Sequence, residues 1–268
     1  MMKKILITGA TDGIGLETAK ILASQGHHLL IHGRNPLKLQ QTIQLLKEMS
    51  GGNQIDSYQA DLSLFSDVNE LTFKIKIEHE YLDAIINNAG VFKTGNTITD
   101  DGLDVRFMVN TIAPYIITKH LTPLLSENAR VVNLSSAAQA PVNIDALLGK
   151  HVIDDDFQAY AQSKLALTVW SQEMAKSLKS NQVIVAVNPG SLLASKMVKE
   201  GFGLAGNDLS IGANILVEAV NSAEFLNASG KYFDNDAQQF SSPHKEAEDP
   251  AKCEQLMAAL MVVTNVKR

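Results

Sequence analysis

The chain has 268 residues, with 23 Lys and Arg side chains against 29 Asp and Glu, and therefore a formal net charge of −6. This acidic balance excludes a basic nucleic-acid binder, because such a protein needs a positively charged surface. Hydrophobic residues make up 45% of the chain and charged residues 19%, which is the composition of a folded globule and excludes a disordered chain.

The sequence predicts a cytoplasmic protein without a membrane span. Cys253 is the only cysteine, so the chain can form no internal disulfide and gives no sign of an oxidising compartment. The apolar run near the start is three residues long before the Thr8-Gly9 turn, which is too short for a signal peptide. No stretch approaches the roughly 20 apolar residues that a membrane span needs. We therefore expect a soluble protein with no membrane span.

Two groups of titratable residues are expected to hold no metal. His27 and His28 lie at a turn and at a strand start, with no third ligand at metal-binding spacing. No metal-ligand pattern flanks the acidic run Asp154-Asp155-Asp156, so a solvated loop is its simplest interpretation. We predict no metal site in this chain.

Short apolar runs rich in Ile, Val and Leu alternate with longer helical patterns along the chain. This alternation predicts a parallel sheet with helices on both faces. Right-handed connections restrict such a chain to a doubly wound, nucleotide-binding topology. The predicted fold class is α/β, a single doubly wound Rossmann domain over residues 1–268, since no linker divides the chain. About seven parallel strands are expected, at Lys4–Thr8, His28–His32, Ile55–Gln59, Ala84–Asn87, Arg130–Leu134, Val183–Asn188 and Gly230–Phe233.

Local signals mark several helix boundaries. Gly26 stands where the end of the first helix needs a residue that tolerates positive φ. Asn35-Pro36 supplies a capping side chain and a first-turn proline for the next helix. In the tail, residues 234–268, a helical patch at Cys253–Val262 carries apolar side chains that we expect to cover the core: Leu256, Met257, Leu260 and Met261.

Two segments do not fit the regular alternation of strands and helices. Residues 137–156 lie between the fifth strand and a helix, and residues 189–208 follow the sixth strand. Loops of about 20 residues are uncommon in compact domains and are often functional lids. Both segments follow the carboxyl ends of strands, where doubly wound sheets bind ligands. We expect them to form the substrate loops.

A glycine-rich turn closes the first strand and opens the first helix. Three glycines stand within Thr8–Gly15, where a plain turn between a strand and a helix needs fewer. Glycine permits a tight turn and lets backbone N–H groups approach a pyrophosphate at the helix N-terminus. We therefore predict a dinucleotide-binding loop made by Gly9, Thr11, Asp12, Gly13, Ile14 and Gly15.

The end of the second strand bears on the choice of dinucleotide. An NAD enzyme usually carries an acidic residue there for the ribose hydroxyls, whereas this chain has Gly33-Arg34. A guanidinium can pair with a 2′-phosphate, so we expect NADP (NADPH), with NAD as the alternative. Asp12 acts against this choice because it places negative charge near the same region. Asp61 is interpreted either as an acceptor for the adenine amino group or as a helix-entry carboxylate, and Leu62 beside it is expected to contact the cofactor.

Tyrosine and lysine four residues apart share one face of a helix, and the chain contains two such pairs. One pair is Tyr115 with Lys119, and the other is Tyr160 with Lys164. The spacing alone cannot choose between them. Only Tyr160 begins a helix that follows a strand ending in hydroxyl-bearing residues, at Ser135-Ser136.

Taken together and in this order, these motifs resemble the classical short-chain dehydrogenase/reductase family over essentially the whole chain. The residues that carry the resemblance are the glycine loop, Asp61-Leu62, Asn87-Asn88-Ala89-Gly90, Val109-Asn110, Ser135-Ser136, Tyr160 with Lys164, and Asn188-Pro189-Gly190. The long gap before Tyr160 and the segment Gly230-Lys231-Tyr232-Phe233 are similar to the retinol dehydrogenase and WW-domain oxidoreductase branch.

The resemblance implies four catalytic residues. Tyr160 is the expected acid/base, Ser136 the hydroxyl that polarises the carbonyl, Lys164 the cation beside the tyrosine, and Asn110 the holder of a water in a proton relay. A tyrosine has an ordinary pKa near 10, so we expect the Lys164 ammonium, with the charge of the cofactor, to lower the pKa of Tyr160. Asn110 is also interpreted as a helix-interior amide bonded to backbone, a role that can coexist with the first.

The resemblance also implies further cofactor contacts, at Asn88, Ala89 and Gly90, at Pro189 and Gly190, and at Tyr160 and Lys164 themselves. The family often has a threonine for the nicotinamide amide, but this chain has Ala194 there, with Ser195 next to it, and we expect Ser195 to take over the contact. In the family, the helix of Tyr160 and the helix around Asn110 frequently pack against a second subunit, which implies a homodimer or homotetramer. We interpret Trp170, on the same helix as Tyr160, as a core or interface residue rather than a pocket residue.

The leading hypothesis is an NADP(H)-dependent oxidoreductase that interconverts a carbonyl and an alcohol on a small to medium, mostly apolar substrate. The alternative is a catalytically weak NADP(H)-sensing binding protein on the same fold, which Ala194 and the loop departures favour. A sugar-nucleotide epimerase or dehydratase also uses a Tyr/Lys pair, but such enzymes have a longer, two-lobed pattern.

Overall fold

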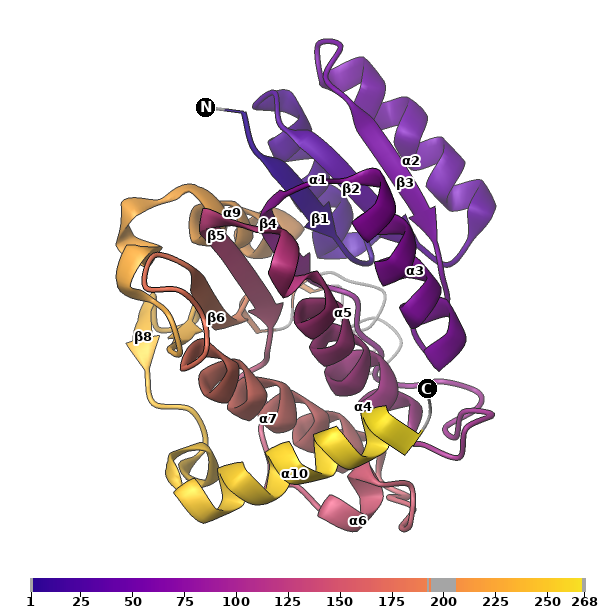
Figure 1. Ribbon diagram of the computed structural model, residues 1–268, viewed down its shortest axis with the longest axis vertical. Helices are drawn as coiled ribbons and strands as arrows, with labels where there is room; N and C mark the ends of the chain where they lie inside the picture. Colours follow the sequence, from indigo (N-terminus) through magenta and orange to yellow (C-terminus); the bar gives the residue numbers. More distant parts are fainter. Residues whose placement is uncertain (1, 192, 194–205, 267–268) are drawn as a thin grey trace.

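The computed structural model describes residues 2–191, 193 and 206–266, and its centre is one eight-stranded sheet (Figure 1). The strand order is β3-β2-β1-β4-β5-β6-β7-β8. Neighbouring strands are parallel throughout, except for the antiparallel pair β7 and β8. The strands are β1 Lys4–Ile7, β2 His28–Gly33, β3 Ile55–Gln59, β4 Leu82–Asn87, β5 Leu125–Leu134, β6 Val183–Asn188, β7 Tyr232–Asp234 and β8 Gln239–Ser241.

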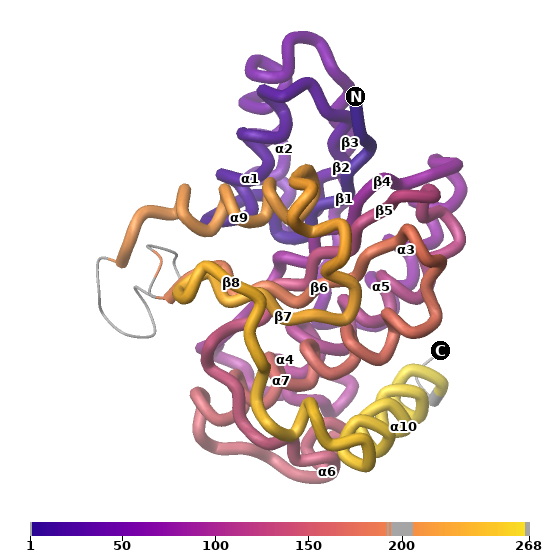
Figure 2. Tube along the Cα trace, turned by 90° about the vertical axis from the view of Figure 1, so that its left-hand side faces the viewer, coloured from indigo at the N-terminus to yellow at the C-terminus, as the bar shows by residue number. Residues whose placement is uncertain are grey.

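Helices cover both faces of the sheet, as the edge view in Figure 2 shows. One face carries α1 Gly13–Ser24, α2 Pro36–Met49 and α9 Leu209–Asn221. The other face carries α3 Phe65–Glu78, α5 Ala113–Leu121 and α7 Asp156–Ala175, with α10 Pro250–Val266 packed across α7. The short helical segments are α4 Val105–Phe107, the π-helix η1 Met108–Ile112, α6 Ile144–Leu147, and the 3₁₀ turns η2 Thr122–Leu124, η3 Ala223–Asn227 and η4 Lys245–Glu248.

The two helical layers enclose two separate apolar clusters, one on each face of the sheet. Successive strand residues point to opposite faces, so Leu6 and Leu30 belong to the cluster under α3, α5 and α7, while Ile7 and Ile31 belong to the cluster under α1 and α9. Burial on both faces explains why the central strands are continuous apolar runs, the pattern that predicted a parallel sheet. The fold class predicted from sequence is confirmed.

The predicted strands are all present, and two of them, Ile55–Gln59 and Val183–Asn188, have the predicted bounds. The sheet has one strand more than expected, because β8 adds an antiparallel edge beside β7. Three aromatic rings pack under this hairpin, since the Phe233 ring lies 5.1 Å from both Phe225 and Phe240 (centroid distances). A strand of three residues forms few backbone hydrogen bonds, so these aromatic contacts stabilise it.

The local helix signals are also present. Gly26 follows α1 with φ of +82°, and the Asn35 side chain accepts a hydrogen bond from the Lys38 N–H at the start of α2. The tail forms α10, which is longer than the predicted patch. Leu256 and Leu260 are buried, and Met257 is partly buried against the same cluster. The prediction is wrong for Met261, which is 48% exposed.

The solvated-loop interpretation of the acidic run holds for Asp154 and Asp155, which are exposed and precede α7, but not for Asp156, which begins the helix. Asp155 caps α7 by accepting a hydrogen bond from the Gln158 N–H, and Asp156 pairs with the buried Arg106. The surrounding segment 137–156 contains α6, whose first turn is capped by Asn143. These bonds order a segment that the sequence pattern treated as an irregular loop.

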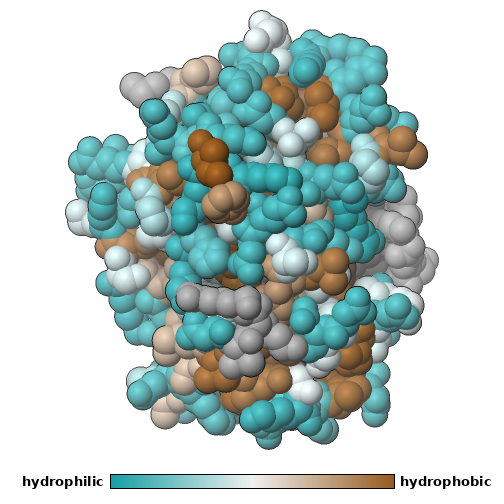
Figure 3. Space-filling view, turned by 45° about the vertical axis from the view of Figure 1, so that its right-hand side comes forward, coloured by the Kyte–Doolittle hydropathy of each residue, from teal (hydrophilic) through white to brown (hydrophobic). Residues whose placement is uncertain are grey.

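Within the described part of the chain, no helix has the length and apolar character needed to cross a bilayer. The face shown in Figure 3 is mostly hydrophilic, with hydrophobic side chains gathered in separate patches. Large apolar side chains with high exposure include Leu37 on α2 and Phe73 and Ile77 on α3. Exposed apolar residues of this kind are ordinary on a folded protein.

Candidate active site

Four chain segments that follow strands meet at one edge of the sheet. The chain leaves β1, β4, β5 and β6 at the same edge because these strands are parallel. Helix α7 brings Lys164 to this edge, where its Nζ donates to the Leu134 main-chain oxygen at the end of β5, 2.7 Å away. Ligands of doubly wound sheets bind at the carboxyl edge where the strand order reverses, and here this reversal lies between β1 and β4. This edge is the candidate active site.

The glycine loop is fitted tightly against the chain that follows β4. Gly9 has φ of +66°, and a Cβ atom on Gly15 would lie 2.3 Å from both the Asn88 Nδ2 and the Gly9 main-chain oxygen. Asn88 Nδ2 donates to the main-chain oxygens of Thr8 and Gly9 at 2.9 and 3.1 Å. The Thr8 hydroxyl accepts from the N–H groups of Asn88 and Ala89. Asn88 and Ala89 therefore hold the loop in shape.

The buried side chain of His32 also fixes the glycine loop, and the sequence reasoning missed it. Its Nδ1 accepts from the Gly9 N–H at 3.2 Å, which leaves Nε2 as the donor to the Ala60 main-chain oxygen at 3.1 Å. Burial lowers the pKa of His32 to about 4, so the ring is neutral at neutral pH. A histidine within the apolar second strand is the signal that could have found it.

The remaining residues of the glycine loop lie at the start of α1. Asp12 caps this helix by accepting from the Gly13 N–H at 2.9 Å. Ile14 is partly buried against the apolar cluster, and Thr11 is partly exposed. The cofactor contacts of these residues stay predictions.

Asp12 also pairs with Lys38, a residue that the sequence reasoning did not single out. The Lys38 Nζ lies 2.7 Å from Asp12 Oδ2, so the negative charge that seemed to oppose a phosphate is balanced. Lys38 stands in the first turn of α2, four residues after the exposed Arg34. Two cations therefore flank the N-terminus of α2, and their chemistry fits a phosphate beside the dinucleotide loop.

The structure favours the helix-entry interpretation of Asp61. Its Oδ1 accepts from both the N–H and the hydroxyl of Ser63, at 2.9 and 2.7 Å, in the turn that leads into α3. The Leu62 side chain is buried in the apolar cluster on the α3 face, and the predicted cofactor contact of this residue stays a prediction. Asp61 as an adenine acceptor stays a prediction.

Tyr160, Ser136 and Lys164 come together at the end of β5. The Lys164 Nζ lies 5.6 Å from the centroid of the Tyr160 ring. Burial raises the pKa of Tyr160, and a hydrogen bond with the Ser136 hydroxyl acts in the opposite direction. Burial lowers the pKa of Lys164 to about 8. Burial therefore dominates the pKa of the phenol in this structure, while the ammonium donates to Leu134, and the lowering expected from Lys164 together with the charge of the cofactor stays a prediction.

The two adjacent serines have different environments, which supports the choice of Ser136. Ser135 is buried and its hydroxyl is 2.6 Å from that of Thr168. Ser136 is partly exposed, and its Oγ accepts from the Ala138 N–H at 3.1 Å. Ser135 thus joins β5 to α7, while Ser136 faces the Tyr160 phenol.

Asn110 lies in the π-helix η1, where the Ala113 N–H bonds to the Met108 oxygen five residues back. Its side chain accepts from the Val91 N–H at 2.8 Å and donates to the Val91 oxygen at 2.9 Å and to the Ser163 hydroxyl at 2.9 Å. The backbone-bonded interpretation of this amide is therefore correct. Its role in a proton relay stays a prediction.

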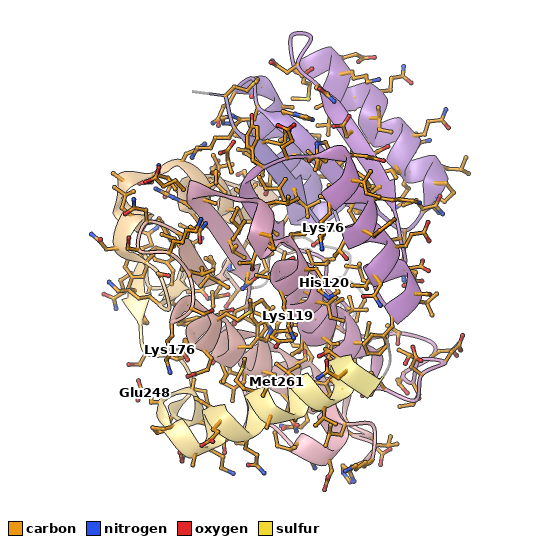
Figure 4. The ribbon with its side chains drawn as sticks, viewed as in Figure 1. Lys76, Lys119, His120, Lys176, Glu248 and Met261 are labelled. Atoms are coloured by element: carbon orange, nitrogen blue, oxygen red, sulfur yellow. The ribbon has the colours of Figure 1, made fainter. Side chains whose placement is uncertain are left out.

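The other Tyr/Lys pair has a different environment. Tyr115 on α5 is buried edge-on against Trp170, with ring centroids 5.8 Å apart, and burial raises its pKa. Lys119 lies near His120 at the end of α5, beside α10, as Figure 4 shows. Trp170 is fully buried, which confirms that it is a core residue. The choice of Tyr160 from chain order agrees with this geometry.

The β7–β8 hairpin holds the Pro189-Gly190 turn, a connection that the sequence reasoning missed. Asn188 Nδ2 donates to Asp234 Oδ1 at 2.8 Å and to Asp236 Oδ2 at 2.9 Å. The Asn235 side chain donates to the Pro189 main-chain oxygen at 2.9 Å. Of the remaining predicted contacts, Gly90 lies in the chain after β4, while Ala194 and Ser195 fall outside the described residues.

An aromatic group stands beside Tyr160. Phe92, in the chain after β4, packs edge-on against the Tyr160 ring at 5.3 Å and against Phe157 at 6.5 Å (centroid distances). Phe157 lies one turn before Tyr160 on α7 and is 44% exposed. This side of the site is apolar.

The model of the short chain dehydrogenase family matches residues 3–203. The chain is 29% identical to human retinol dehydrogenase 13 over 93% of its own length and 81% of the relative. It is 32% identical to mouse retinol dehydrogenase 12, over 86% of this chain and 77% of the relative. It is 28% identical to the WW domain-containing oxidoreductase of Pongo abelii, over 93% of this chain and 66% of the relative.

Solved structures give the same result for the fold. A chain described as a short chain dehydrogenase from Escherichia coli CFT073, complexed with NADPH, superposes with a TM-score of 0.71 at 26% identity, over 87% of this chain and 96% of that one. A similar chain from Shigella flexneri, complexed with NADP, superposes with a TM-score of 0.69 at 26% identity, over 87% and 97% of the two chains.

Proposed function

The chain belongs to the short chain dehydrogenase family, and from this premise we propose that it is an NADP(H)-dependent oxidoreductase that interconverts a carbonyl and an alcohol. The observation that carries the proposal is the meeting of Ser136, Tyr160 and Lys164 at the carboxyl edge of the sheet, beside the glycine loop. Side chains from the chain after β5 and from α7 supply a hydroxyl donor, a phenol and an ammonium there.

The residues for the cofactor are those of the glycine loop, with the Arg34 and Lys38 cations beside them. The N-terminus of α1 and the loop N–H groups would hold the pyrophosphate, and the two cations would hold a 2′-phosphate. The NADP and NADPH complexes of two similar structures support this choice over NAD. When bound, the nicotinamide ring exchanges a hydride with the substrate carbon.

Tyr160 acts as the acid/base in this proposal. Its phenol donates a proton to the substrate oxygen during reduction and accepts one during oxidation, while the Ser136 hydroxyl donates a hydrogen bond to the same oxygen. Lys164, whose pKa is lowered to about 8, stays mostly protonated at pH 7 and places positive charge beside the phenolate that forms. The Asn110 segment would complete a relay that returns the proton to solvent.

The substrate that we propose is small to medium in size and mostly apolar. Phe92 and Phe157 form an apolar surface next to the Tyr160 ring. Several similar proteins are named retinol dehydrogenases and one a polyprenol dehydrogenase, which supports an apolar alcohol or its carbonyl as substrate.

The test compares Tyr160→Phe with Tyr115→Phe on a panel of apolar aldehydes, ketones and alcohols. Tyr160→Phe removes the transferred proton, so we expect turnover to fall by about 100-fold or more. The matched control Tyr115→Phe removes a hydroxyl from a buried tyrosine on α5 and should keep turnover within about threefold. Binding of NADPH, followed by its fluorescence, should be nearly unchanged in both variants. If Tyr160→Phe keeps the turnover of the wild type, Tyr160 is not the acid/base.

The second candidate function is a catalytically weak, NADP(H)-sensing binding protein, favoured by Ala194 in place of the family's threonine. The same panel separates the two. NADPH binding without turnover of any carbonyl or alcohol would support the sensing protein.

A cytoplasmic location and assembly as a homodimer or homotetramer remain part of the proposal.

A further inference from the structure

The main-chain oxygen of Ser136 accepts hydrogen bonds from two side chains in different parts of the chain. The Tyr232 hydroxyl on β7 donates to it at 3.2 Å, and the Gln139 Nε2 donates to it at 3.0 Å. Gln139 is itself held, because its Oε1 accepts from the main-chain N–H of His244 at 2.9 Å. The position of Ser136 therefore depends on β7 and on the chain that follows β8.

The Ser136 side chain is oriented as well. Its Oγ accepts from the Ala138 N–H at 3.1 Å, so the hydroxyl proton is directed elsewhere. That hydroxyl bonds with the Tyr160 phenol and opposes the increase in the phenol's pKa. Because the carbonyl and the hydroxyl belong to one residue, a shift of the Ser136 main chain would also move its Oγ relative to the phenol.

Tyr232 is a suitable permanent donor for this contact. Its ring is buried, and burial together with the charges of Asp234 and Asp236 raises its pKa well above the ordinary range. The hydroxyl therefore stays protonated at neutral pH. The strand that carries it is fixed between β6 and β8, so the donor cannot follow a displaced carbonyl.

We propose that Tyr232 and Gln139 are positioning residues for catalysis, which hold the Ser136 main chain so that its hydroxyl meets both the Tyr160 phenol and the substrate oxygen. This inference rests on the proposed function. Through these two residues, strand β7 and the chain after β8 would influence the acid–base chemistry by positioning Ser136 rather than by contacting the substrate.

The first test is Tyr232→Phe, which removes one hydroxyl and keeps the ring. We expect kcat to fall about tenfold, the loss that corresponds to one hydrogen bond of ordinary strength, with the Kd of NADPH within about twofold of the wild type. The apparent pKa of Tyr160 in the pH profile of kcat should rise, because the Ser136 bond that lowers it is weakened. Gln139→Met replaces the amide by a side chain of similar length that has no hydrogen-bond donor, so it should also lower kcat and raise the apparent pKa of Tyr160. Tyr115→Phe serves as the matched control.

A double-mutant cycle with Ser136→Ala separates positioning from general loss of structure. If Tyr232 acts through Ser136, Tyr232→Phe should change kcat by less than about twofold in the Ser136→Ala background. An equal loss in both backgrounds would overturn the inference. Should Tyr232→Phe fail to fold, as judged by circular dichroism, Gln139→Met is taken through the same cycle.

The outcomes distinguish this inference from the proposed function. The positioning role alone is overturned if Tyr160→Phe and Ser136→Ala lose turnover while Tyr232→Phe and Gln139→Met keep the turnover and pH profile of the wild type. Retained turnover in Tyr160→Phe overturns the proposed function and this inference with it.

Discussion

Arg106 pairs with Asp156 and so joins the helical segment around Asn110 to the first turn of α7. The same guanidinium donates to both carboxylate oxygens of Asp104, at 2.7 and 2.6 Å. Arg106 and Asp104 are almost fully buried, whereas Asp156 is partly exposed. Tyr160 lies one helical turn beyond Asp156, so this ion pair fixes the start of the helix that carries the phenol.

Replacing Arg106 should therefore destabilise the fold strongly. Arg106→Met leaves the Asp104 carboxylate buried without its cation, and we expect the free energy of unfolding to fall by roughly 3–5 kcal/mol. Urea unfolding measures this change. The control is Lys176→Ala, which breaks an exposed pair with Glu173 at the far end of α7 (Figure 4) and should change the free energy of unfolding by less than about 1 kcal/mol. Equal losses in the two variants would contradict the prediction.

Because His32 is buried, we expect the protein to lose stability in mild acid. The pKa of its ring is about 4 in the folded chain and 6.5 in the unfolded one, so the unfolded chain binds the proton more readily. The contribution of His32 is present in full above pH 6.5 and is lost as the pH falls toward 4, by up to about 3 kcal/mol. Urea unfolding at several pH values should show a smaller decline for His32→Asn than for the wild type.

The control for this prediction is His151→Asn, at an exposed histidine. Its pH dependence should match that of the wild type. Burial also lowers the pKa values of His27 and His79, and both residues contribute to the pH dependence of stability equally in every variant. The difference between the wild type and His32→Asn therefore isolates His32, and parallel curves would refute its role.

The cations beside α2 predict selectivity between the two dinucleotides. Arg34→Ala removes a charge-assisted bond to the 2′-phosphate, so the Kd of NADPH should rise about 10- to 100-fold while that of NADH changes by less than about threefold. Lys38→Ala should act in the same direction. Fluorescence titration measures both constants, with Lys47→Ala at the other end of α2 as the control. Equal weakening of NADH and NADPH binding would argue against a 2′-phosphate site.

Neighbouring residues on α10 should differ sharply in their effect on stability. Leu260 is fully buried, so Leu260→Ala should lower the free energy of unfolding by about 2–5 kcal/mol. Met261, the next residue on α10 and labelled in Figure 4, is half exposed, and Met261→Ala should change the free energy of unfolding by less than about 1 kcal/mol. Thermal and urea unfolding compare the two. Similar effects would mean that α10 does not pack on α7 in solution.

Much of the fold could be predicted because the pattern that determines it is local. Strands buried on both faces are continuous apolar runs, and β3 and β6 have the predicted bounds for that reason. The edge strand β8 could not be predicted, since three residues are too few to show a pattern and the strand depends on aromatic packing with β7. Tyr160 could be chosen over Tyr115 because chain order places it after a strand that ends in hydroxyl groups.

The parts of the site that the sequence did not predict are contacts between distant residues. Asp156 was interpreted as part of a solvated loop because its partner, Arg106, is 50 residues away. The bond from Tyr232 to Ser136 spans 96 residues. The burial that raises the pKa of Tyr160 was not predicted either, because spacing places a lysine beside a tyrosine but does not show how deeply the phenol is buried.

The π-helix at Met108–Ile112 has a consequence for how this chain tolerates changes in length. Its wide turn accommodates one residue more than a regular helix, and that surplus turns the Asn110 amide toward the chain after β4. Deleting Val109 would restore ordinary winding without shortening any strand. Because this turn joins the segment of the buried Arg106 to α5, the deletion should rotate one of the two against the core, so loss of a single residue should cost stability as well as the direction of the Asn110 amide.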